Sequence, residues 1–115
     1  MKNLKNISRI LKTFSGDDLE ISFNGKKEIA SLRKVLIDSI SVYKTQVPDE
    51  ILAVYELGLS VTQKEEFSID DAKLALLEKI VLLNPLNYPI IALGQTIKIL
   101  RELPDSYSDS GASAK

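Results

Sequence analysis

SIDDAKLALLEKIVLLNPLNYPIIALGQTIKILREL, residues 68–103, is the stretch that decides the fold of this 115-residue chain. Its apolar residues recur every three or four positions, a spacing that places them on one side of an α-helix. We expect two helices, over residues 69–83 and 90–103, joined by a rigid turn that contains two prolines. Ser68 is the expected N-cap of the first helix. The sequence therefore predicts a helical hairpin in this half of the chain.

Both helices carry apolar side chains on more than one face. Leu74 and Val81 lie off the main apolar stripe of the first helix, and Ile91 and Ile99 lie off that of the second. A helix that is covered this widely is either central in the fold or part of an interface. We therefore take these four residues as candidate protein interface residues, with burial in the core of the domain as the alternative.

The first fourteen residues are expected to form an amphipathic helix. Helical spacing places five apolar residues on one side: Leu4, Ile7, Ile10, Leu11 and Phe14. The basic residues gather on the opposite side: Lys2, Lys5, Arg9 and Lys12. These four are candidate nucleic-acid contacts, because cations on one helix face can bind phosphates. No base-reading set of side chains accompanies them, so sequence-specific recognition is not indicated. The alternative is a solvated polar face.

Residues 19–23 alternate between apolar and polar, the pattern of a half-buried strand. The pair Asn24-Gly25 then suits a tight turn. Apolar residues beyond it step by three and four, however, which favours a helix over 27–44 and not a second hairpin strand. A lone strand needs a partner. The internal candidate is Leu59–Thr62; the other is a second copy of the chain, with Phe23 as a candidate interface residue.

The middle of the chain is expected to hold a short helix over 48–57, with proline in its first turn and glycine at its end. A polar connection over 59–67 follows it. Residues 45–71 carry seven acidic residues against the single Lys64, so this segment complements the basic N-terminus. The acidic segment 49–71 is therefore a further candidate interaction surface.

The predicted fold is a single, mainly α domain over residues 1–104. We expect a compact bundle of about five helices with one short β-strand or β-turn segment near residues 19–25. Residues 105–115 are rich in serine, aspartate, glycine and alanine, and are expected to form a disordered tail.

Composition excludes several familiar chemistries. The chain has no cysteine and no histidine, which removes disulfides, thiolate sites and a Ser-His-Asp triad. We expect no enzyme activity, no cofactor, no metal and no small-molecule substrate. No apolar run approaches the ~20 residues of a membrane span, so a cytoplasmic protein is expected. The net charge of −1 gives no overall field that would attract nucleic acid.

These observations favour binding over catalysis. We predict a small, non-enzymatic binding or regulatory protein that acts through protein–protein contact or self-association. Regulators, inhibitors, immunity proteins and assembly accessory proteins, such as phage genomes encode, belong to this class. A nucleic-acid accessory protein and a minor structural subunit of a larger assembly stay open as alternatives.

Overall fold

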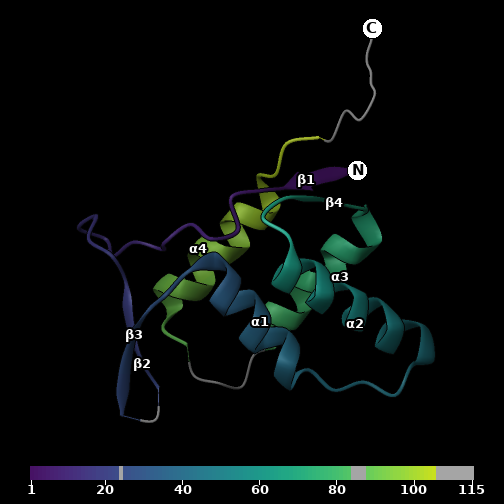
Figure 1. Cartoon of the computed structure of the whole chain (residues 1–115), viewed down its shortest axis with the longest axis horizontal. Coiled ribbons are helices and arrows are strands. Elements are labelled where there is room, and N and C mark those ends of the chain that lie inside the picture. The colour runs from purple at the N-terminus through teal and green to yellow at the C-terminus, as the bar shows by residue number, and fades with distance from the viewer. Residues whose placement is uncertain (24, 84–87, 106–115) are drawn as a thin grey trace, which may run out of the picture.

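The computed structural model describes residues 1–23, 25–83 and 88–105. The described chain forms four helices and four short strands: β1 (Lys2–Leu4), β2 (Glu20–Phe23), β3 (Lys26–Ile29), α1 (Leu32–Val42), α2 (Pro48–Gln63), β4 (Phe67–Ile69), α3 (Asp71–Leu82) and α4 (Ile90–Arg101). The helices make up the body of the molecule, and the β2–β3 hairpin projects from one side (Figure 1). The fold is mixed though mainly helical, so the prediction of a bundle of about five helices is wrong.

The first fourteen residues do not form the predicted helix. They run extended: β1 pairs antiparallel with β4, and Asn6 has a φ of 56°, a left-handed conformation that interrupts any helix. Further along, the amide of Leu11 donates to the carbonyl of Ala30 at 2.8 Å, and the amide of Leu19 donates to the carbonyl of Leu11 at 2.9 Å. Pairing with distant segments thus supplies the hydrogen bonds that a helix would make within itself.

Not all of the apolar residues that helical spacing placed on one face of this segment are buried. Leu4, Ile7 and Leu11 are buried, whereas Ile10 is 38% exposed and Phe14 is 92% exposed. The physical reason is the extended backbone, in which successive side chains point to opposite sides and a three-to-four spacing does not define one face.

Strands β2 and β3 form a hairpin, which the sequence analysis did not expect. The strand predicted over 19–23 is confirmed as β2, and it pairs antiparallel with β3, which the sequence analysis assigned to a helix. Gly25 has a φ of 79°, the conformation that a tight hairpin turn requires. The helix predicted over 27–44 starts too early, because α1 begins at Leu32 and Ser31 is its N-cap. The partner predicted at Leu59–Thr62 is also wrong, since those residues lie in α2.

Helix α2 is six residues longer at its C-terminal end than the predicted range 48–57. It continues through Gly58, where an added Cβ would lie 3.5 Å from Cγ2 of Ile40 in α1. The glycine therefore marks a close approach between two helices and not a helix end.

Helices α3 and α4 match their predicted ranges apart from one or two residues at their ends. The N-cap of α3 is Asp70, whose side chain accepts a hydrogen bond from the amide of Lys73 at 2.8 Å, while Ser68 belongs to β4. Most of the predicted turn, residues 84–87, and the tail from residue 106 lie outside the described residues.

The core is built from the extended N-terminal segment and all four helices. Its fully buried side chains include Leu4, Leu11, Leu36, Val61, Leu77 and Leu100. The two ends of the described chain meet beside β1: the amide of Asn3 donates to the carbonyl of Pro104 at 2.9 Å. The N-terminal segment is therefore part of the core and not an appendage.

Candidate binding site

The four basic residues expected on one helix face lie along the extended segment. Lys2 pairs with Asp105 at 2.8 Å, and Lys12 pairs with Asp18 at 2.5 Å. Arg9 turns back and donates hydrogen bonds to two nearby backbone carbonyls, while Lys5 is exposed. The cations do not form the helical face from which nucleic-acid contact was predicted.

The apolar interface candidates on the last two helices contact the core. Val81 is completely buried, and Leu74, Ile91 and Ile99 are half-buried and packed against the core cluster. The fifth candidate is Phe23, whose side chain lies outside the described residues. Val81 is thus a core residue, whereas the partly exposed surfaces of Leu74, Ile91 and Ile99 leave their role as interface residues a prediction.

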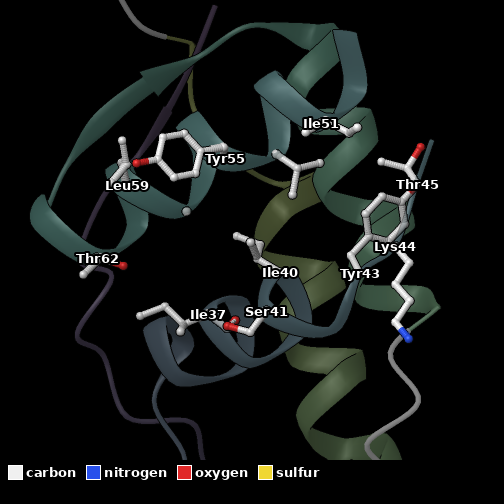
Figure 2. A pocket seen from close by; sticks show the side chains of 12 residues that line it. Ile37, Ile40, Ser41, Tyr43, Lys44, Thr45, Ile51, Tyr55, Leu59 and Thr62 are labelled. Atoms are coloured by element: carbon white, nitrogen blue, oxygen red, sulfur yellow. Dashed lines mark hydrogen bonds between the residues drawn. The ribbon is translucent and has the colours of Figure 1, made fainter. Parts of the chain in front are cut away.

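An apolar groove of about 620 Å³ lies between α1 and α2 (Figure 2). We call it the α1–α2 groove. Ile40, Val54 and Gly58 belong to its lining where the two helices approach each other. Its sides are formed by residues of both helices, chiefly Ile37, Ser41, Ile51, Tyr55 and Leu59.

Helix α2 exposes a row of apolar side chains along this groove. Ile51 is 50% exposed, Leu52 59% and Tyr55 63%, and Val47 and Leu59 extend the row at its two ends. Ile51, Tyr55 and Leu59 follow one another at spacings of four residues, and Leu52 lies three residues before Tyr55, so these side chains lie on neighbouring parts of one helix face, with Val47 at the N-cap. We call these five residues the α2 row. Contiguous exposed apolar surface of this kind is typical of interaction sites.

One end of the groove is fixed by a polar cluster. The hydroxyl of Tyr43 donates to the carboxylate of Glu50 at 2.6 Å, and Lys79 of α3 lies 3.7 Å from the same carboxylate and 5.8 Å from the ring centre of Tyr43. The hydrogen bonds from Tyr43 and then from Thr45 hold the pKa of Glu50 below its ordinary value. The connection between α1 and α2 is thereby tied to α3.

The other end is fixed by Arg33 of α1. Its Nε donates to the carbonyl of Val61 at 2.9 Å, and its Nη2 donates to the carbonyl of Lys64 at 3.0 Å and to the carboxylate of Glu65 at 3.1 Å. Arg33 thus binds the carbonyls at the C-terminal end of α2, where a cation is favourable. The two helices are held together at both ends of the groove.

Three polar side chains of the groove have no hydrogen bond or ion pair with the part of the chain that the structure describes: Lys44, Tyr55 and Thr62. Ser41 differs, because its hydroxyl donates to the carbonyl of Ile37 at 2.7 Å. Lys44 lies at one end of the groove beside Tyr43, and Thr62 lies at the other (Figure 2). Within the described part of the chain, the site therefore combines an apolar surface with one cation and two hydroxyls that have no partner.

A second hollow, of about 550 Å³, lies on α4 next to the end of α3. Ile90, Leu93, Gly94 and Ile97 give it an apolar centre. Arg101 at its border pairs with Glu78 of α3 at 2.8 Å. Of the described residues that line this hollow, Leu82 and Ile90 are the large apolar side chains that are exposed, fewer than in the α2 row, so the hollow is the weaker candidate.

Sequence reasoning missed the α2 row. A helix that ends at residue 57 leaves Leu59 and Thr62 in a polar connection, apart from Ile51 and Tyr55, whereas α2 continues to Gln63. The criterion that singled out Leu74 and Val81 on α3, apolar residues off the main stripe, also applies to Leu52. Applied over the full length of α2, it would have identified the row.

The described residues contain no group of three or more carboxylates that could hold a metal ion, and none of their helices has the length and apolar character to cross a membrane. Comparisons with protein-family models, with curated proteins and with solved structures find no match. The geometry of the site is therefore the basis for a functional proposal.

Proposed function

We propose that this protein is a small binding protein that acts through protein–protein contact, with the α1–α2 groove as its docking surface. The observation that carries the proposal is the continuity between the groove and the exposed α2 row. Burial of apolar surface contributes about 25 cal/mol per Å² to association, before the costs of ordering are subtracted. A partner that covers the row and the groove together removes more apolar surface from water than one that covers either alone.

The fixed ends of the groove support this proposal. Tyr43 and Glu50 at one end, and Arg33 at the other, hold α1 and α2 in place without a partner. A preorganised surface loses little conformational entropy on binding. The groove is thus suited to docking with little change of shape.

Docking at the groove also requires no rearrangement of existing ion pairs. By contrast, phosphate binding at the N-terminal segment would compete with the carboxylates that already pair with Lys2 and Lys12. This difference favours a protein partner over nucleic acid.

The proposal is tested by affinity capture from the native host with matched variants. Leu52→Glu and Tyr55→Glu place a charge on the α2 row, at positions exposed enough for the fold to tolerate it. Ile90→Glu is the control, because Ile90 is 82% exposed on α4 and lies outside the groove. We expect one protein to be captured by the wild type and by Ile90→Glu, and to be lost with both α2 variants while their circular dichroism is unchanged. Capture that is equal for all variants, or lost only with Ile90→Glu, contradicts the proposal.

A further inference from the structure

We infer that the occupant of the α1–α2 groove is an amphipathic helix of a partner protein that brings a carboxylate side chain to Lys44. This inference rests on the proposed function and specifies the shape and the charge of the partner. It follows from the geometry of the helix pair, from the length of the α2 row and from the distribution of polar groups along the groove.

The shape of the site favours a helix. Two helices that approach closely, as α1 and α2 do where Gly58 faces Ile40, leave a trough along their line of contact. An amphipathic helix inserts its apolar side chains into such a trough, which is a common mode of peptide recognition. An added β-strand needs a sheet edge with free backbone groups, and the groove is lined by two helices and their connection.

The length of the α2 row distinguishes a helix from a small ligand. Val47 and Leu59 are twelve residues apart, which corresponds to about 18 Å, or roughly three helical turns. A small molecule in the groove would leave Leu52 and Val47 in water, because neither lines the groove itself. A helix of three to four turns along α2 covers both of them.

Charge specifies the partner further. Of the twelve residues that line the groove, Lys44 alone is charged, and it forms no ion pair with another described residue. The hydroxyls of Tyr55 and Thr62 form no hydrogen bond with the described residues and can donate to a partner. An apolar face with an acidic residue at one end complements this arrangement, and such charge pairing chiefly sets orientation and specificity.

The test uses two synthetic helical peptides of about sixteen residues, long enough to cover the row. Both carry leucine at every third and fourth position and neutral flanking residues; the single charged residue, at the end that faces Lys44, is glutamate in one peptide and lysine in the other. Binding to the full chain is measured by fluorescence anisotropy. We expect the wild type to prefer the glutamate peptide about two- to fivefold, as exposed charge pairs do, and to lose this preference at high salt.

Single substitutions test whether Lys44 and the α2 row contact the bound peptide. Lys44→Glu should reverse the preference to the lysine peptide, whereas Lys98→Glu, which changes a lysine of the second hollow, should leave it unchanged. Leu52→Glu should weaken both peptides, because Leu52 lies on the row but outside the groove lining.

Three results would overturn the inference. Absence of binding by either peptide, while capture from the host succeeds, rejects a helix and leaves the proposed function intact. Equal binding of both peptides to the wild type and to Lys44→Glu rejects the role of Lys44. Tight binding of laurate that Leu52→Glu does not affect, together with weak peptide binding, identifies a small apolar acid as the occupant.

Discussion

Glu65 accepts hydrogen bonds from two separate segments of the chain. Its carboxylate accepts hydrogen bonds from the hydroxyl of Ser8 at 2.5 Å, from the amide of Ser8 at 2.8 Å and from Nη2 of Arg33 at 3.1 Å. These donors, the Ser8 hydroxyl first, favour the charged form and lower the pKa of Glu65 from its ordinary value of 4.5. One carboxylate thus joins the N-terminal segment, α1 and the connection after α2.

This environment predicts a pH-dependent contribution to stability. Because the pKa of Glu65 is lower in the folded than in the unfolded chain, its contribution is present above the unfolded pKa and is lost as the pH falls through the folded pKa. We expect Glu65→Gln to unfold more easily than the wild type at neutral pH, and the difference to shrink below about pH 4.5. Urea unfolding of both proteins between about pH 3 and pH 7 measures it. A difference that does not change with pH would contradict the assignment.

At the scale of the element, the sequence predicts long, periodic helices well and short paired segments poorly. Helices α3 and α4 were predicted because their apolar spacing persists over three turns. By contrast, β3 is exposed at all four positions, so no apolar alternation marks it, and its pairing with β2 depends on the turn at Gly25. The start of α1 did carry a local signal in Ser31, which the continuous apolar spacing obscured.

Two glycines in different elements should respond oppositely to the same substitution. Gly94 lies inside α4 with nothing within 4 Å of an added Cβ, so Gly94→Ala should stabilise the protein by about 0.5–1 kcal/mol. Gly25 has a φ of 79°, so Gly25→Ala should destabilise it by about 1–2 kcal/mol. Denaturant unfolding of both variants tests the pair; a loss of stability in Gly94→Ala would show that the α4 surface requires the glycine.

At the scale of the whole molecule, the N-terminal segment closes the core. Its predicted helix failed because β1 finds its partner in β4, more than sixty residues away, and local spacing carries no information about that pairing. The groove escaped prediction for a related reason: its two walls, with Ile37 on α1 and Tyr55 on α2, face each other only when α1 packs on α2. Contacts between segments that are distant in sequence therefore determine both the extended structure of the N-terminal segment and the position of the α1–α2 groove.

Two substitutions distinguish the closed core from the predicted surface helix. Leu4 is fully buried and Phe14 almost fully exposed, although helical spacing placed both on one apolar face. Leu4→Ala should cost about 2–5 kcal/mol of unfolding free energy. Phe14→Ala should change it by less than about 0.5 kcal/mol. Thermal or urea unfolding measures both variants. Equal losses of unfolding free energy would contradict the extended segment and favour the predicted helix over the first fourteen residues.

The meeting of Asn3 with Pro104 makes the described chain almost a closed ring. A covalent link across this short gap would leave the folded backbone in place while restricting the unfolded chain. Ring closure over about 100 residues removes unfolded-state entropy worth about 4–5 kcal/mol in the loop-entropy model. By the same topology, new ends opened at the β2–β3 turn would give a circular permutant in which every core contact is kept.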